Sequence, residues 1–347
     1  MSNRPSHLPT PARVAIVGAT GAVGMELLAC LQQRAFPLQQ LRLFASERSA
    51  GRSLRFRGEP LPLEVLRSES LTGLDLVLCS AGSSVARRFA PPAADCGAIV
   101  IDNSSAFRTQ LQVPLVVPEV NPETLATHTG LIANPNCVAI IASLALRPLQ
   151  RAAGLRRLTM ATYQAASGGG AAAMQELLSA TRAALAGKSF TPRVLPHPYA
   201  FNLFSHNTAI DADSGLNEEE IKVTRELRRL LSAPSLPIGV TCVRVPVLRA
   251  HAMALTVEFD RPLSVPEARG LLAEAAGVRL VDDRERNHFP MPSAASGIDE
   301  VLVGRIRTDG SDPSGHTLAL FVAGDQLRKG AALNAVQIAE RLLEAKR

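Results

Sequence analysis

Aromatic residues are scarce in this chain of 347 residues, which has no tryptophan and only two tyrosines. Proteins that bind single-stranded nucleic acid stack bases on aromatic side chains, so this composition argues against that function. Arginine outnumbers lysine by 33 to four and the formal net charge is +6, but no run of basic residues forms an arm for nucleic acid. The positive balance is compatible with small anionic ligands, and we expect no nucleic-acid partner.

Cysteine is also sparse, and its pattern excludes two kinds of site. The cysteines are odd in number and form no C-x-x-C pair, so the sequence predicts neither a disulfide framework nor a zinc site: Cys30, Cys79, Cys96, Cys137 and Cys242. No metal is therefore expected, and free thiols fit a reducing cytosol, so a cytoplasmic location is predicted.

Long apolar runs are missing as well. No uninterrupted apolar stretch reaches the roughly 18 residues of a membrane-spanning helix, so we expect no membrane partner. The N-terminal MSNRPSHLPTPAR is polar and proline-rich, without the apolar core of a signal peptide. Residues 1–12 are therefore expected to be a short disordered lead.

The first part of the chain alternates between strand-like and helix-like segments. Apolar runs at residues 13–18, 38–46, 74–82 and 98–105 predict strands, and the intervening MELLACLQQRA and SVARRFAPPAADCG predict helices. Alternation of this kind is typical of a parallel sheet with helices on both faces. We predict a Rossmann-type, doubly wound α/β domain over residues 13–135.

The pattern changes after residue 135. A long helix is predicted over residues 137–153, followed by strand-rich segments such as LTMATYQAAS, GVTCVRVPVLRAHAMALTVEF, VLVGRIRTD and HTLALFVAGD. The chain ends in an amphipathic helical pattern. We predict an α+β domain with a mixed sheet over residues 136–325, and a terminal helix within residues 326–347 that packs back on the first domain.

Three glycines at residues 18, 21 and 24 join the first strand to the first helix. Glycine allows a tight turn and a close approach of the backbone to phosphate. The start of the following helix offers free N–H groups and a favourable dipole. The spacing G-x-x-G-x-x-G differs from the common dinucleotide fingerprint, so a glycine-rich turn without a ligand is the alternative reading.

The second predicted strand ends in FASERSAG, where nucleotide-binding domains distinguish NAD from NADP. NAD-binding domains place an acidic residue here for the ribose hydroxyls, whereas a nearby arginine accommodates a 2′-phosphate. Arg48 and Ser49 are available, with Ser46 before them, although Glu47 weakens the distinction. We predict NADP as the cofactor.

Cys137 follows the turn Asn134–Pro135–Asn136 and begins an apolar helical run. Three interpretations compete: a buried filler, a metal ligand and a nucleophile. A helix dipole stabilises a thiolate at its N-terminus, and thiolates attack aldehydes and acyl phosphates well. Position alone does not decide among the three, because lone cysteines near helix starts are usually filler.

Other polar residues stand where a ligand could be bound. His251 follows RVPVLRA and is a candidate base, although a lone histidine is more often structural. Arg244 could hold a carboxylate by two parallel hydrogen bonds, or form a surface salt bridge. Gln164 precedes the small-residue loop AASGGG, Arg108 follows a strand end, and EEEIK opens a helix that could simply be solvated.

Taken together, the segments resemble the aspartate-semialdehyde dehydrogenase family from Val14 to about Leu343. The resemblance is carried, in the family's order, by GATGAVG, SERSAG, IDNSSAFR, VPLVVPEVN, NPNC, TYQAASGGG, TCVRVPV, VGRIR and LRKGAALNAVQIAE. It implies a reversible reaction in which L-aspartate 4-semialdehyde, phosphate and NADP give L-4-aspartyl phosphate and NADPH, in aspartate-derived amino-acid biosynthesis. It also implies that the second domain is catalytic and dimerising, in a homodimer or homotetramer.

The resemblance also implies roles for individual residues. Cys137 matches the nucleophile, His251 the acid–base residue and Gln164 the residue that orients the thioester. Substrate contacts are implied for Arg244, Glu219, Arg108, Lys222 and Asn136, with the phosphate held by Arg108 and Lys222. Cofactor contacts are implied for Gly18, Thr20, Gly21, Ala22, Val23, Ser46, Arg48, Ser49, Ser80, Ser167, Gly168 and Gln326.

The chain departs from the family pattern at two points. Asp325-Gln326 stands where the family usually has Asp-Asn, and LFSHNTAIDADSGLNEEE differs from the usual segment, so His206 has no assigned counterpart. Glu219 is preferred over Glu218 and Glu220 only by its spacing from Lys222. The alternatives are an N-acetyl-γ-glutamyl-phosphate reductase or a catalytically silent paralogue. A glyceraldehyde-3-phosphate type enzyme shares the chemistry, but its sequence blocks are absent.

Overall fold

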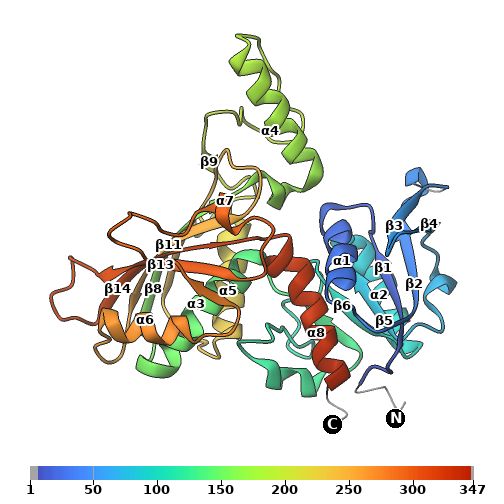
Figure 1. Cartoon of the computed structure of the whole chain (residues 1–347), viewed down its shortest axis with the longest axis horizontal. Coiled ribbons are helices and arrows are strands. Elements are labelled where there is room, and N and C mark those ends of the chain that lie inside the picture. The colour runs from blue at the N-terminus through green and yellow to red at the C-terminus, as the bar shows by residue number, and fades with distance from the viewer. Residues whose placement is uncertain (1–6, 50, 345–347) are drawn as a thin grey trace. The chain divides into compact units, whose positions relative to one another are not determined.

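A computed structural model describes residues 7–49 and 51–344, which fall into two compact units (Figure 1). Unit 1 contains residues 1–136 and 331–347, and unit 2 contains residues 137–330. These limits lie close to the domain boundaries predicted above. Whether each unit is an independently folding domain stays a prediction.

Unit 1 is built on a seven-stranded sheet in the order β3-β4-β2-β1-β5-β6-β7. All neighbouring pairs are parallel except β3–β4, which is antiparallel. The strands are β1 Ala12–Val17, β2 Leu38–Ala45, β3 Ser53–Phe56, β4 Glu59–Val65, β5 Leu76–Cys79, β6 Ile99–Asp102 and β7 Leu131–Ala133. Their central members are almost wholly buried, as expected for a parallel sheet covered on both faces.

The helices of unit 1 make the sheet doubly wound. The chain moves from β1 through α1 (Ala22–Gln33) to β2 in one direction, and from β5 through α2 (Ser83–Asp95) to β6 in the other. Right-handed crossovers in opposite directions put α1 and α2 on opposite faces. The terminal helix α8 (Leu333–Glu344) packs beside α1 (Figure 1). The predicted Rossmann-type sheet is confirmed.

Two local features of unit 1, and one where the chain returns to it, differ from the sequence expectation. Leu8 is buried in the core and its N–H bonds to the Leu342 carbonyl, so the predicted disordered lead is wrong there. Residues 1–6 lie outside the described residues. The β3–β4 hairpin was not predicted, and the terminal helical pattern begins with a π-helical turn, η5 (Arg328–Ala332), before α8. The unit also contains short 3₁₀ turns η1 (Glu47–Ser49), η2 (Ser68–Leu71) and η3 (Pro122–Thr127).

Unit 2 is built on a seven-stranded mixed sheet in the order β12-β13-β14-β11-β8-β10-β9. The pairs β8–β10 and β12–β13 are parallel and the others antiparallel. The strands are β8 Arg157–Gln164, β9 Phe204–Ser205, β10 Ile238–Arg244, β11 His251–Glu258, β12 Val278–Leu280, β13 Val301–Thr308 and β14 Thr317–Gly324. The predicted mixed sheet is confirmed.

The helices of unit 2 include one that anchors the sheet. Helix α3 (Cys137–Ala153) is buried along nearly all of its length and packs against α5 (Glu218–Leu230), α6 (Val265–Ala273) and the strands β13 and β14. Helix α5 starts with a capping box in which Asn217 and Glu220 bond each other's backbone N–H groups. This box fixes the first turn of α5, which carries Glu219.

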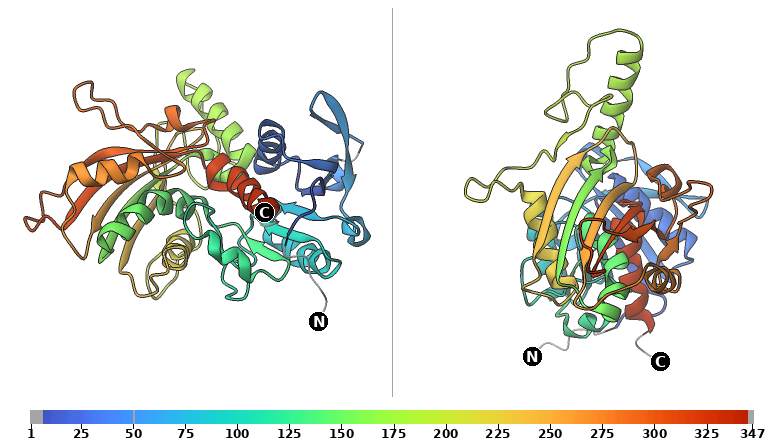
Figure 2. Two further views of the ribbon diagram at one scale, coloured as in Figure 1. Left: turned by 60° about the horizontal axis from the view of Figure 1, so that its bottom comes forward. Right: turned by 90° about the vertical axis from the view of Figure 1, so that its left-hand side faces the viewer.

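One helix of unit 2 extends away from its sheet. Helix α4 (Gly170–Leu185), drawn in green, begins after the 3₁₀ turn η4 (Ala166–Gly169) and projects from the sheet in both figures (Figures 1 and 2). Only four of its residues are buried. The chain returns through residues 186–203 to β9, and the remaining helix of the unit is the short α7 (Pro292–Ala295).

Within residues 7–49 and 51–344, no helix has both the length and the apolar character needed to cross a membrane.

Candidate active site

The glycine loop of unit 1 is held by contacts that leave no space for side chains. Gly18 has a φ of +85°, and a Cβ there would lie 3.0 Å from the backbone of Ser80 and Ala81. A Cβ on Gly24 would overlap the carbonyl oxygen of Gly18. These two glycines therefore allow the turn and the close approach of α1 to it. A Cβ on Gly21, the N-cap of α1, would make only an ordinary van der Waals contact.

A cavity of about 430 Å³ opens beside this loop, at the carboxyl ends of β1, β2 and β5. The sheet order reverses between β1 and β5, which is where open α/β sheets bind nucleotides. Of the predicted cofactor residues, Gly18, Thr20, Gly21, Ser46 and Ser80 line the cavity. Glu47, which weakens the distinction between NADP and NAD, also lines the cavity. The sequence reading missed further lining residues, among them Phe44, Val65, Leu66, Val85, Arg88 and Phe89.

The other predicted cofactor residues of unit 1 lie around the cavity without lining it. Ala22 and Val23 form the first turn of α1, whose N–H groups have no helical partner. Arg48 and Ser49 lie in η1, where Arg48 is exposed and the Ser49 N–H bonds to the Ser46 carbonyl. Arg48 directly follows Glu47, which lines the cavity, and an exposed guanidinium is suited to binding a phosphate.

Three predicted residues of unit 2 meet at one edge of its sheet. Gln164 is the last residue of β8 and pairs in register with Arg244, the last residue of β10. His251 is the first residue of β11, which runs antiparallel to β8. The register therefore brings together residues from three separate segments, all nearly fully buried.

The imidazole of His251 is held in one orientation. Its Nδ1 accepts a hydrogen bond of 3.0 Å from the Ala165 N–H, so the neutral ring carries its proton on Nε2. Nε2 is buried and has no partner among the described residues. Burial and then the Arg244 charge lower the pKa of His251 well below its usual range, so the ring is neutral near pH 7.

Arg244 and Gly168 occupy the same corner. Arg244 is 5% exposed and donates from Nε to Asn207 Oδ1 at 3.2 Å and from Nη1 to the Ala165 carbonyl at 3.2 Å. A Cβ on Gly168 would lie 2.9 Å from Arg244 Nη1 and 3.1 Å from His251 Nε2. The loop therefore lies close against both side chains, and a Cβ at residue 168 would require Arg244 and His251 to shift. Ser167 beside it has a buried hydroxyl without a partner in the described chain.

The three consecutive glutamates of α5 have different environments. Glu218 is exposed and pairs with Lys222, and Glu220 caps the helix and accepts from the Cys242 N–H. Glu219 is 7% exposed, and its Oε1 accepts a 3.1 Å hydrogen bond from Gln164 Nε2. Glu219 is thus the glutamate connected to the sheet-edge cluster.

Cys137 is the first residue of α3 and is partly exposed. A Cβ on Gly330 would lie 3.0 Å from Cys137 Cβ and 3.2 Å from Gln326 Cβ. Gln326 in turn accepts from the Ala250 N–H, beside His251, and its own Nε2 has no partner in the described part of the chain. By contrast, burial raises the pKa of the Cys79 and Cys242 thiols to about 12, so neither is a thiolate near neutral pH.

Two predicted phosphate ligands belong to different units. In unit 1, Arg108 donates to the carbonyls of Asn134 and Asn103, which fixes its guanidinium beside the turn leading to Asn136. In unit 2, Lys222 lies on α5 with a side chain that is 33% exposed. Asn136 is 6% exposed.

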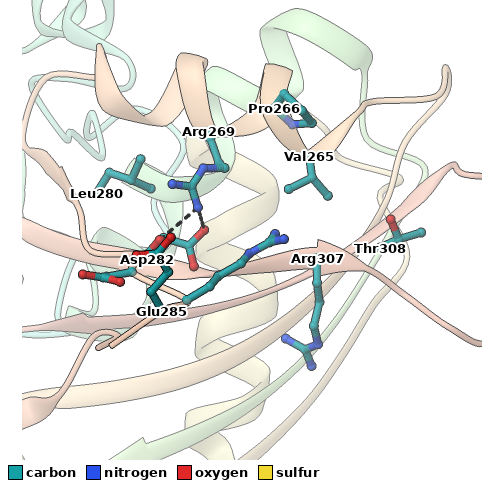
Figure 3. Close-up of a pocket in the computed structure, with 10 residues that line it drawn as sticks. Val265, Pro266, Arg269, Leu280, Asp282, Glu285, Arg307 and Thr308 are labelled. Atoms are coloured by element: carbon teal, nitrogen blue, oxygen red, sulfur yellow. Dashed lines mark hydrogen bonds and ion pairs between the residues drawn. The ribbon is translucent and has the colours of Figure 1, made fainter. Parts of the chain in front are cut away.

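Unit 2 has a cavity larger than the one in unit 1, and none of its lining residues belongs to the cluster of Gln164, Arg244 and His251. It measures about 880 Å³ and lies between α6, the segment after β12 and the end of β13 (Figure 3). Arg269 and Asp282 form an ion pair in its wall (Figure 3). The sequence reading did not single out these residues. Among the described residues, no group of histidine, cysteine or acidic side chains is arranged to hold a metal ion.

A nucleotide cavity in one unit and a buried histidine–arginine cluster with an accessible cysteine in the other define an oxidoreductase of the semialdehyde dehydrogenase class. Two family profiles match accordingly: "Semialdehyde dehydrogenase, NAD binding domain" over residues 13–128 and "Semialdehyde dehydrogenase, dimerisation domain" over residues 146–329. The chain belongs to the aspartate-semialdehyde dehydrogenase family. The resemblance read from the sequence is confirmed.

Individual relatives agree along the whole chain. An aspartate-semialdehyde dehydrogenase of Synechocystis is 52% identical over 97% of this chain and 99% of its own, and one of Bacillus subtilis is 43% identical over 95% and 96%. The crystal structure of aspartate semialdehyde dehydrogenase II from Vibrio cholerae superposes with a TM-score of 0.93 at 40% identity, covering 97% of this chain and 99% of that one. A second structure of that Vibrio enzyme is complexed with ASA.

Proposed function

We propose that the protein interconverts L-aspartate 4-semialdehyde, phosphate and NADP with L-4-aspartyl phosphate and NADPH, through an acyl thioester on Cys137. The observation that carries the proposal is the convergence of Gln164, Arg244 and His251 at one sheet edge of unit 2. Beside them, Gln326 links the surroundings of His251 to those of Cys137. Family membership supports the substrate class.

Cys137 acts as the nucleophile. Its position at the start of a helix with 17 residues favours the anionic thiolate through the helix dipole. The sulfur attacks the aldehyde carbon to give a thiohemiacetal, which becomes a thioester on oxidation. Attack of phosphate on the thioester carbon then releases the acyl phosphate and restores the thiolate. In the biosynthetic direction the same steps run in reverse.

His251 handles the proton on the substrate oxygen. Its Nδ1 is occupied by the Ala165 N–H, so Nε2 is the ring atom open to substrate. With its proton on Nε2, the neutral ring donates a hydrogen bond to the substrate oxygen, which stabilises the negative charge that develops there as the thiolate adds to the aldehyde. Gln164, held by Thr162 and Glu219, orients the carbonyl of the thioester.

Arg244 and Glu219 recognise the amino-acid end of the substrate. A guanidinium binds the α-carboxylate and a carboxylate binds the α-ammonium group, and both side chains are nearly buried. Arg108 and Lys222 bind the phosphate, for which two cations suit a dianion. Asn136, next to the nucleophile, is proposed as a further substrate contact.

NADP is the proposed cofactor. The glycine loop, the free N–H groups of α1 and the adjacent cavity fit a dinucleotide, and exposed Arg48 with Ser49 fits its 2′-phosphate. Ser167, Gly168 and Gln326 are the proposed contacts from unit 2. When bound, the nicotinamide accepts hydride in the oxidative direction and supplies it in the reductive one. We also propose a homodimer or homotetramer, which the dimerisation-domain match supports.

The test is phosphate-dependent reduction of NADP with L-aspartate 4-semialdehyde, followed by the absorbance of the NADPH that forms. About one NADPH is expected for each aldehyde consumed. Parallel assays use NAD, and N-acetyl-L-glutamate 5-semialdehyde as the competing substrate. We expect turnover that requires phosphate and prefers the aspartate-derived aldehyde and NADP. Preference for the N-acetylated substrate, or turnover that does not need phosphate, would refute the proposal.

A further inference from the structure

His206 has no assigned role, yet it lies inside the cluster. It is 6% exposed, and its N–H donates to the Cys242 carbonyl at 2.8 Å, next to the short antiparallel pairing of β9 with β10. This pairing places His206 opposite Cys242, which lies two residues before Arg244 on β10. The backbone at His206 is thus held by the sheet.

Several charged side chains act on the buried ring of His206. Burial, together with the charges of Arg244 and Lys222 and against that of Glu219, lowers the pKa of His206 to about 4. The pKa of His251 is in turn lowered by His206. His206 therefore stands among the residues proposed to bind the two ends of the substrate, and its ring is neutral at pH 7.

The hydrogen bond with Thr208 engages Nδ1 of this neutral ring, so Nε2 is the ring atom left for a ligand. The Glu219 N–H donates to Thr208 Oγ1 at 3.2 Å, which leaves the hydroxyl proton free to be donated. Thr208 Oγ1 lies 3.3 Å from His206 Nδ1. If the hydroxyl donates to Nδ1, the ring proton is on Nε2, for which no hydrogen bond is found among the described residues.

We propose that His206 is a positioning residue that donates a hydrogen bond from Nε2 to the α-carboxylate of the substrate, beside Arg244. A neutral donor adds a second contact to the carboxylate without placing another buried cation next to Arg244. Thr208 couples this contact to Glu219, so the residues that bind the carboxylate and the ammonium group share one network. The inference rests on the proposed function of this site.

The test uses three aldehydes that differ at the amino-acid end. L-Aspartate 4-semialdehyde has both groups, succinate semialdehyde lacks the ammonium group, and 3-aminopropanal lacks the carboxylate. For His206→Ala we expect kcat/KM to fall by about 10–50-fold with the first two aldehydes, mainly through KM, as for loss of a hydrogen bond to a charged group. With 3-aminopropanal the change should stay within about threefold. Where turnover is slow, each analogue is measured as a competitive inhibitor.

Matched variants separate positioning from a structural role. The amide nitrogen of His206→Gln can replace Nε2, whereas that of His206→Asn corresponds to Nδ1, so the glutamine variant should retain more activity than the asparagine variant. Thr208→Val should cause a smaller loss on the same two aldehydes. His288→Gln, at an exposed histidine between β12 and β13, should change nothing. The KM for NADP should stay constant throughout.

Two results would overturn the inference. One is an equal loss of kcat/KM with all three aldehydes, which would indicate a structural role. The other is equal activity of the alanine variant and the unmodified protein with L-aspartate 4-semialdehyde. Failure of the proposed function would be distinguished from both, because the unmodified protein would then lack phosphate-dependent turnover of that aldehyde.

Discussion

The two units build their sites in opposite ways. In unit 1 the site consists largely of backbone: the glycine loop and the first turn of α1 lie within one short segment at residues 18–24. In unit 2 the site consists of buried side chains from β8, β10, β11 and α5, which are far apart in the sequence. Binding a nucleotide needs N–H groups and space, whereas the chemistry needs particular functional groups held in register.

The strongest way to separate the two sites is to remove the nucleophile. Cys137→Ala should lower kcat by about 10⁴-fold or more, because no thioester can form. NADP binding, measured by fluorescence titration of NADPH, should be unchanged because the cofactor cavity lies in unit 1. Cys96→Ala, at an exposed cysteine, is the matched control. Turnover at the unmodified rate would show that the assigned mechanism is wrong.

Gly168→Ala tests how closely the catalytic side chains are packed. The added Cβ would lie 2.9 Å from Arg244 Nη1 and 3.1 Å from His251 Nε2. Displacing both groups should lower kcat/KM by about 100-fold. The control is Gly239→Ala on β10, where a Cβ meets nothing within 4 Å. Equal activity of both variants would contradict the described packing, and thermal unfolding checks that the fold is retained.

Arg48→Ala tests cofactor choice in unit 1. Losing a charge-assisted hydrogen bond to the 2′-phosphate should raise the KM for NADP about 30-fold and leave that for NAD nearly unchanged. Arg55→Ala, which removes an exposed arginine of β3, is the matched control. A parallel rise in both KM values would mean that Arg48 does not contact the phosphate, and Arg88 in the cavity wall would then be tested in the same way.

Acid should destabilise unit 2 through its two buried histidines. The pKa of His206 is about 4 and that of His251 lies well below its usual range, whereas unfolded histidine titrates near pH 6.5. Between these values the unfolded state binds more protons, so the free energy of unfolding falls as pH decreases below about 6.5. The slope should reach about 1.4 kcal/mol per pH unit for each histidine.

Urea denaturation at pH 7 and at steps down to about pH 4 measures this slope. His206→Gln should reduce it, because the variant keeps a polar side chain that does not titrate. An unchanged slope in the variant would show that His206 is not neutral in the folded protein. His288→Gln provides the comparison with an exposed histidine.

Elements whose apolar residues form a clear run or a clear periodic pattern were predictable from the sequence. The apolar runs of β1, β5 and β6 and the start of α3 at Cys137 follow directly from composition and periodicity. The β3–β4 hairpin was missed because its residues are mostly polar or exposed. Helix α4 was missed because it begins within a triple glycine and buries only four of its residues, so its apolar pattern is weak.

The candidate site was predictable where it depends on a motif and not where it depends on tertiary register. The glycine loop and Cys137 stand in recognisable local contexts. His206 and Thr208 do not, because their relation to Arg244 and Glu219 arises from the pairing of β9 with β10 and from the placement of α5. Likewise, spacing alone could not distinguish among the three glutamates of α5, which differ only in their partners.

The excursion through α4 leaves the sheet after Gln164 and returns to it at β9, just before His206. Both of its ends are therefore held in the sheet by strands. The positions of Gln164 and His206 then do not depend on the length of the segment between them. Changes within α4 and the chain that follows it are therefore expected to leave the groups on either side in place.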